Sequence, residues 1–185
     1  DKNKIAKLLS EIGIDYIEGG WPGANPVDTE FFSKPLNLNK SIFTAFGMTK
    51  RTGRSADNDP SLSSLINASC PAICVVGKAW DFHVKTALEI KNEDNLENIK
   101  DTAKHIIKNG KEFLFDAEHF FDGFKSNPEY ALDCLKSAYD QGARWVVLCD
   151  TNGGTLPHEV GEIVSKIAKV IPGKNLGIHA HNDTE

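Results

Sequence analysis

The feature that most constrains the fold is a unit that recurs along the chain: an amphipathic helix, a glycine and a short β-rich run. Helical stripes of apolar residues end at Gly13, Gly110, Gly142 and Gly173, and an apolar run follows each glycine at once. Glycine suits the left-handed backbone position that often follows a helix end. With two further apolar runs between these units, the predicted strands are 14–18, 41–47, 72–77, 112–116, 144–149 and 175–178. Strands that alternate with helices at this spacing predict βα units and a parallel sheet.

Two architectures share this pattern, an open doubly wound sheet and a closed (β/α)8 barrel. No glycine-rich phosphate-binding turn follows an early strand, which argues against the dinucleotide-binding form of the open sheet. Polar and charged residues instead follow the carboxyl ends of almost all the predicted strands; they include Glu18, Lys50, Lys78, Glu118, Asp150 and His179. Barrel enzymes build their active sites from such a ring of residues at one rim. The sequence therefore predicts a (β/α)8 barrel, or TIM barrel.

The number of predicted strands bears on the domain organisation. Six strands are visible, whereas a closed barrel has eight and typically ~250 residues. We therefore expect residues 1–185 to form a single catalytic barrel domain that is incomplete at both ends. Its first and last strands would be missing, and no regulatory domain would be present.

Composition excludes several classes of protein. The chain is 40% hydrophobic and carries a net charge of -5, which is typical of a globular domain and argues against a general nucleic-acid binder. No apolar run reaches the ~20 residues of a membrane span, so we expect no membrane partner and a cytoplasmic location. Cys70, Cys74, Cys134 and Cys149 form no CxxC pair and no second cluster completes a zinc site. They are expected to be buried, reduced thiols.

The sharpest local signal is His179-Ala180-His181, which Asn182 and Asp183 follow. Residues two apart in a strand face the same side, so both imidazoles are expected to point into the barrel mouth. Two neutral imidazoles at this spacing can bind one divalent cation, although a structural or surface pair is the competing interpretation. Three other histidines, His83, His105 and His158, lie in or near predicted helices. Of these three, only His83 closely follows a strand end, and we expect it to be packed.

Three further positions have both a chemical and an ordinary interpretation. Glu118 could orient substrate, transfer a proton or hold a ligand histidine, or it could be a solvated carboxylate near a helix start. Thr151 could bind a carboxylate through its hydroxyl, or it could belong to an ordinary polar loop that leads to a helix start at 155–157. Lys50, Arg51 and Arg54 form a basic spot that suits an anionic substrate or a phosphate-bearing cofactor, or an exposed loop.

Five segments occur in the same order as the motifs of one enzyme family: YIEGGWPG (16–23), GKAWDFH (77–83), DAEHFFDG (116–123), LCDTNGGTLP (148–157) and GIHAHND (177–183). Together they resemble the acyl-CoA-condensing TIM-barrel enzymes, which are the citramalate, 2-isopropylmalate and homocitrate synthases. The segment 77–83 is most similar to the citramalate synthase-like branch. The resemblance covers essentially the whole chain.

The resemblance implies a role for each matching residue. His179 and His181 match two histidine ligands of a divalent metal, which would be Mg, Mn or Zn. Glu118 matches a catalytic carboxylate near the bound 2-oxo acid and the reacting acetyl group. Thr151 matches a residue that binds the carboxylate of the 2-oxo acid. Asp116 occupies a position that contributes to substrate selection in relatives.

The same resemblance implies the reaction. Acetyl-CoA would condense with a 2-oxo acid, pyruvate being preferred and giving citramalate, and the thioester would then be hydrolysed, in the biosynthesis of branched-chain amino acids such as isoleucine. The full-length form is expected to be a homodimer. The family's first-strand Asp-x-Thr-Leu-Arg-Asp-Gly motif, its later Asn ligand and its helper His have no match in this sequence. The chain would therefore hold two of the usual protein ligands.

Several alternatives stay open from the residues alone. The enzyme could be a 2-isopropylmalate or homocitrate synthase, or a lyase or aldolase of the same superfamily, such as a hydroxymethylglutaryl-CoA lyase-like enzyme. A metal-dependent hydrolase also uses an HxH pair, but usually on its first strand. A non-catalytic, truncated barrel is the remaining possibility.

Overall fold

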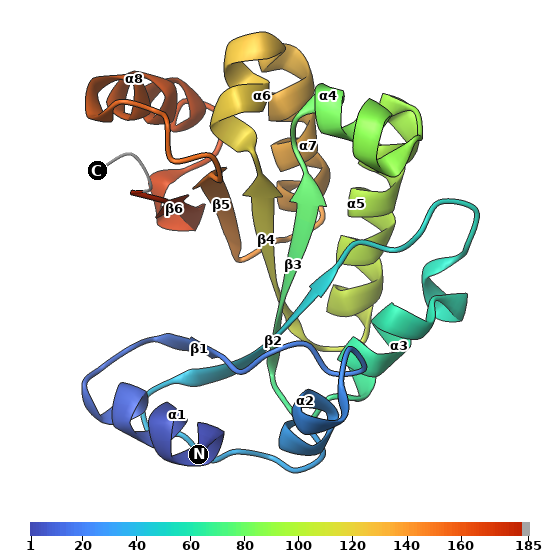
Figure 1. Ribbon diagram of the computed structural model, residues 1–185, viewed down its shortest axis with the longest axis vertical. Helices are drawn as coiled ribbons and strands as arrows, with labels where there is room; N and C mark the ends of the chain where they lie inside the picture. Colours follow the sequence, from blue (N-terminus) through green and yellow to red (C-terminus); the bar gives the residue numbers. More distant parts are fainter. Residues whose placement is uncertain (183–185) are drawn as a thin grey trace.

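The computed structural model describes residues 1–182, so Asp183 of the histidine motif lies outside the described residues (Figure 1). In this part of the chain one sheet contains six parallel strands in the order in which they occur in the sequence. They are β1 (Tyr16–Glu18), β2 (Ile42–Met48), β3 (Ala72–Lys78), β4 (Glu112–Glu118), β5 (Trp145–Asp150) and β6 (Leu176–Ala180). The parallel sheet predicted from the sequence is confirmed.

Helices connect the successive strands. They are α1 (Lys2–Glu11), α2 (Pro26–Phe31), α3 (Pro60–Asn67), α4 (Asp81–His83), α5 (Asn92–Lys108), α6 (Phe120–Ser126), α7 (Pro128–Tyr139) and α8 (Pro157–Ile167). Three short turns are η1 (Ala56–Asn58), η2 (Val84–Leu88) and η3 (Gly173–Asn175). None of the helices in residues 1–182 combines the length and the apolarity needed to cross a membrane.

The sheet curls into a half-barrel. Figure 1 shows the strands bending around a concave face, with β1 and β6 at the two edges and the helices on the convex side. Each strand pairs only with its sequence neighbours, which is the strand order of a (β/α)8 barrel and not that of a doubly wound sheet. The predicted barrel fold, present here as a fragment, is confirmed.

Alternation along the strands separates the core from the concave face. In β4, Phe113, Phe115 and Ala117 belong to the main apolar core, which packs against the helices. Leu114, Asp116 and Glu118 point the other way, because successive side chains of a strand face opposite sides of a sheet. The site is built from this second set of positions.

The concave face is apolar near the amino ends of the strands. Ala72, Cys74 and Leu114 form a small buried cluster there, and Tyr16 and Trp145 are among the side chains that pack against it. On β4 the polar residues Asp116 and Glu118 follow Leu114 by two and four positions, and on β1 Glu18 follows Tyr16 by two positions. The floor of the half-barrel is therefore closed by apolar groups, and its open rim is polar.

All six strands differ from their predicted bounds by one or two residues at one or both ends. β3 and β4 continue to Lys78 and Glu118, beyond the predicted ends, because these two residues are partners in the register of the β3–β4 pair. β1 begins at Tyr16, later than predicted. Lys78 and Glu118 therefore end regular strands rather than lie in loops, which fixes the direction of their side chains.

The helix ends follow local chemistry at most of the predicted positions. The side chains of Asn25 and Asn127 cap α2 and α7, and each accepts a hydrogen bond from the backbone N–H three residues later. Gly110 and Gly142 take the expected positive φ, 75° and 103°. The same expectation for Gly173 is wrong, because this residue starts the turn η3 and is absent from the positive-φ glycines of residues 1–182.

Candidate active site

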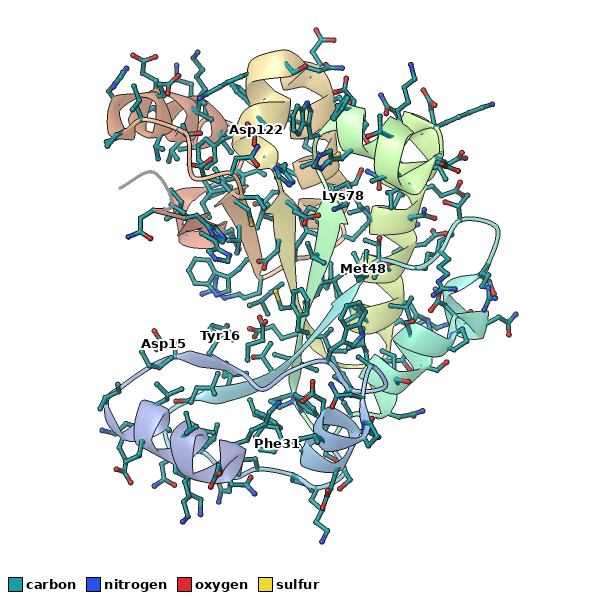
Figure 2. All side chains as sticks on the ribbon, in the orientation of Figure 1. Asp15, Tyr16, Phe31, Met48, Lys78 and Asp122 are labelled. Carbon is teal, nitrogen blue, oxygen red and sulfur yellow. The ribbon has the colours of Figure 1, made fainter. Side chains whose placement is uncertain are left out.

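The polar rim of the half-barrel brings together the residues that the sequence singled out. Asp116 and Glu118 lie on β4, His179 lies on β6, and Thr151 directly follows β5. His181 directly follows β6. Lys78 ends β3 at the same rim, close to the start of α6 (Figure 2). Because carboxyl ends of parallel strands meet at one edge, side chains from distant parts of the sequence become neighbours here.

Glu118 is held by an ion pair. The Nζ atom of Lys78 donates to Oε2 of Glu118, and both side chains are mostly buried. The pair follows from the register, in which the two residues lie opposite each other on β3 and β4. The Glu118 carboxylate is thereby fixed in orientation at the rim, with its other oxygen available for a further contact.

Thr151 joins two rim loops. Its Oγ1 accepts a hydrogen bond of 2.9 Å from the backbone N–H of His119, which stands in the left-handed region with φ 55°. Nearby, Asn152 donates to Asp122 at 2.9 Å, and Nδ1 of His119 lies 3.3 Å from the same carboxylate. Since Oγ1 of Thr151 already accepts the hydrogen bond from His119, the O–H group of Thr151 can donate a hydrogen bond to a further group.

His179 and His181 lie on the same side of the chain, as the spacing predicted. Their rings stack with centroids 5.1 Å apart, and both side chains are exposed. An oxygen of Asp116 and the Sγ of Cys149 lie within 4.8 Å of a ring nitrogen of His179. Two imidazoles beside a carboxylate are donors that suit a divalent cation, so the residues present fit the metal site that the sequence motif implies.

Carboxylates and thiols lie side by side below the rim. The surrounding protein atoms, followed by the Asp116 charge, raise the pKa of Glu18 on β1 to about 7. Burial likewise raises the pKa of Asp116, which a hydrogen bond with Cys74 opposes. Burial and the charges of Asp116 and Glu118 raise the pKa of the Cys149 thiol. Burial is the first cause of all three shifts, because an environment with little water disfavours the charged form of a carboxyl or thiol group.

The four cysteines are free and buried, as expected, but they are not equivalent. Cys74 and Cys149 face the concave side next to Asp116, whereas Cys134 belongs to the main core. Sequence reasoning missed the position of these two thiols and the ion pair of Lys78. Counting alternate residues back from Thr151 would have placed Cys149 on the concave face, but nothing in the sequence gives its neighbours on β4 and β6.

Other candidate residues serve the fold. Asp150 points away from the concave face and accepts two hydrogen bonds of 3.0 Å from Thr155, so the interpretation of this residue as part of the rim is wrong. Lys50 is buried; its Nζ donates to the Arg54 carbonyl at 3.1 Å and lies 3.4 Å from Asp101. Its charge is therefore already paired. Lys50 therefore does not provide an open anion-binding site in the basic spot.

His83 is packed, as predicted. Its ring lies edge-on to that of His119, with centroids 4.3 Å apart, and 4.8 Å from that of Trp80. Burial lowers the pKa of His83, followed by the nearby charge of His119. The neutral ring belongs to an aromatic cluster that supports the loop after β4.

The family model described as HMGL-like matches residues 1–185. The chain belongs to this family. Among curated members, it is 52% identical to an (R)-citramalate synthase of Aquifex aeolicus (strain VF5) over 187 residues and 51% identical to one of Geobacter sulfurreducens over 188. Each match covers 100% of this chain and 35% of the relative. A 2-isopropylmalate synthase of Sulfolobus acidocaldarius is more distant, at 30% over 183 residues, with 98% of this chain and 45% of the relative covered. The resemblance to the citramalate synthase-like branch is confirmed.

Solved structures of similar shape support the HMGL-like fold. A hydroxymethylglutaryl-CoA lyase of Bacillus subtilis matches with a TM-score of 0.81 at 15% identity, over 100% of this chain and 62% of that chain. A second lyase, from Pseudomonas aeruginosa, matches with a TM-score of 0.79 at 16% identity, over 99% and 61%. At this identity the likeness concerns the fold alone. This HMGL-like chain spans 35% of the length of the citramalate synthases it matches, so the activity of the whole protein is a matter of proposal.

Proposed function

We propose that the protein is a citramalate synthase, an acyltransferase that condenses acetyl-CoA with pyruvate and hydrolyses the resulting thioester. The observation that carries this proposal is the level of identity. Five curated (R)-citramalate synthases are 42–52% identical over the whole chain, whereas a 2-isopropylmalate synthase and a homocitrate synthase are 30% and 27% identical. We place the reaction in branched-chain amino-acid biosynthesis, in a cytoplasmic homodimer with small-molecule substrates. Residues 1–185 would be part of its single catalytic barrel domain.

Glu118 is the proposed general base. Its carboxylate stands at the rim, fixed by Lys78, where it can withdraw a proton from the acetyl methyl group of acetyl-CoA. The carbanion formed then attacks the ketone carbon of the 2-oxo acid. General-base catalysis typically contributes ~10²–10⁴-fold, so we expect Glu118→Gln to lower kcat within that range.

Thr151 is the proposed ligand of the substrate carboxylate. The His119 N–H occupies its oxygen and leaves the hydroxyl proton for the substrate. Thr151→Val should therefore raise KM for the 2-oxo acid about tenfold, the equivalent of one hydrogen bond to a charged group. Thr151→Ser keeps the hydroxyl and is the matched control.

His179 and His181 would hold the divalent metal, which supplies a Lewis acid to polarise the 2-oxo group when bound. Asp116 lies next to His179 on the inner side of the rim and is the proposed selectivity residue. A carboxylate in this position repels the second carboxylate of a substrate such as 2-oxoglutarate. The arrangement thus favours a 2-oxo acid that carries a single carboxylate.

The test is a thiol-release assay on the full-length protein with acetyl-CoA and a panel of 2-oxo acids. We expect the highest kcat/KM with pyruvate. Faster CoA release with 2-oxoisovalerate or 2-oxoglutarate would instead identify an isopropylmalate or homocitrate synthase. No release with any 2-oxo acid, together with cleavage of hydroxymethylglutaryl-CoA, would replace the proposal by a lyase.

A further inference from the structure

A second set of metal-binding atoms lies on the inner side of the histidine pair. Three such atoms lie within 4.8 Å of one another: a ring nitrogen of His179, the Sγ of Cys149 and a carboxylate oxygen of Asp116. The three residues come from three adjacent strands, and Cys149 and His179 are direct partners in the β5–β6 register. Within residues 1–182 this is the one group of three such ligands that meets at this distance.

The spacing is close to that of a metal site. Bonds to zinc are ~2.0–2.3 Å for nitrogen, oxygen and sulfur ligands, so the ligand atoms of a tetrahedral site lie about 3.5 Å apart. The difference from 4.8 Å is small. Rotation of the His179 side chain about its own torsion angles can bring its ring nitrogen closer to the other two ligand atoms without moving the sheet.

The chemistry of the three ligands favours a soft cation. Thiolate and imidazole together select ions such as Zn²⁺ over Mg²⁺, which prefers oxygen ligands. The Sγ of Cys149 has a weak alternative partner, the Val147 carbonyl oxygen at 3.8 Å, so little is lost when it turns to an ion. The carboxylates of Asp116 and Glu118 add negative charge around the thiol.

We propose that Asp116, Cys149 and His179 form a binding site for a thiophilic divalent cation, Zn²⁺ or Cd²⁺, that competes with the His179–His181 pair for the shared imidazole. Binding forms a bond between the ion and Sγ of Cys149, and the thiol proton leaves to solvent. The fourth position stays open to water. Because His179 cannot serve both arrangements at once, occupation of the inner site withdraws it from the rim.

The test uses Cd²⁺ alone, added to the metal-free, full-length protein. A cadmium–thiolate bond gives an ultraviolet charge-transfer absorption that a carboxylate or imidazole site lacks. We expect this band in the parent protein, its loss in Cys149→Ser, and at least tenfold weaker Cd²⁺ binding in that variant. Cys70→Ser is the matched control, because Cys70 and Cys149 are each 6% exposed and each lies near a local carbonyl oxygen.

Two further variants separate this inference from the proposed function. His181→Ala should keep the cadmium band but lose Mn²⁺ binding, whereas His179→Ala should lose both. A band without any Mn²⁺ binding would refute the metal pair of the proposed function and leave the inner site standing. A band that survives in Cys149→Ser, or that Cys70→Ser removes equally, overturns the inner site.

Discussion

The same substitution at two helical glycines should have opposite effects on stability. Gly123 lies in α6, directly after the rim residues, and its helix packs against the loop that follows β3. A Cβ atom at Gly123 would overlap the Ala79 carbonyl oxygen and lie 3.0 Å from the Cα of Trp80. Both neighbours are backbone atoms, which cannot turn away as a flexible side chain can. Gly161 in α8 is exposed, and a Cβ there would meet no atom within 4 Å.

The magnitude follows from two opposing contributions. Alanine in place of glycine in a helix stabilises by about 0.5–1 kcal/mol, because the unfolded chain loses less entropy on folding. Overpacking against fixed backbone costs about 3 kcal/mol at the upper end of the usual range. Gly123→Ala should therefore lose about 2 kcal/mol of unfolding free energy, and Gly161→Ala should gain up to about 1 kcal/mol.

The assay is urea unfolding of the full-length variants, followed by tryptophan fluorescence, with the free energy taken by linear extrapolation. Trp80 touches the site of the clash and should report it directly. We also expect Gly123→Ala to raise KM for the 2-oxo acid, because α6 carries the loop whose His119 N–H binds Thr151. Equal stability of Gly123→Ala and the parent would refute the reasoning, as would destabilisation of Gly161→Ala.

Three further predictions concern charged groups. The hydrogen bond from Lys2 holds the pKa of the Asp28 carboxyl below its ordinary value, so Asp28→Asn should cost about 1 kcal/mol at pH 7. This difference from the parent should vanish in acid urea titrations, because the contribution of Asp28 is lost as pH falls through its folded pKa. Glu18 has the opposite sign: its pKa is raised from 4.5 to about 7, so it destabilises the fold increasingly over that range. Glu18→Gln should be about 1 kcal/mol more stable than the parent at pH 8 and equal to it at pH 4.5, in the same unfolding assay. The expected gain is smaller than the full free energy of the pKa shift, because the Glu18 side chain is exposed and water screens its charge. Lys78→Met should lower kcat about tenfold by freeing the Glu118 carboxylate. The double variant with Glu118→Gln should lose no more activity than Glu118→Gln alone, and additive losses in the thiol-release assay would contradict a shared role.

The fold could be predicted because its signals are local. Phe113, Phe115 and Ala117 alternate with Leu114 and Asp116, and this pattern alone assigns one face of β4 to the helices. Glycines after helices and asparagines before prolines mark the ends of the elements. The order of the strands then follows from βα connections, which place each strand next to its predecessor.

The site was only partly predictable, because the local sequence pattern does not determine how neighbouring strands align with each other. Thr151 and His179 could be placed at the rim, since each lies at or after a strand end. The ion pair of Lys78 with Glu118 depends on how β3 and β4 align across 40 residues of chain. For Asp150 the simple rule of proximity to a strand end failed, because the alternation turns its side chain to the other face.

The layers of the concave face confine any substrate to the outer half of the barrel. Tyr16, Trp145 and Leu114 close the interior at the amino ends of the strands. Asp116 stands one pleat repeat further out, and Glu118 one repeat beyond it, about 6.6 Å along the strand. In the reaction we propose, a small 2-oxo acid would lie between these two layers, with the Asp116 carboxylate beneath it and the proposed base Glu118 above it. A bulkier substrate would have to displace either the Asp116 layer or the apolar floor, so the side chain at position 116 is where a change of specificity should begin.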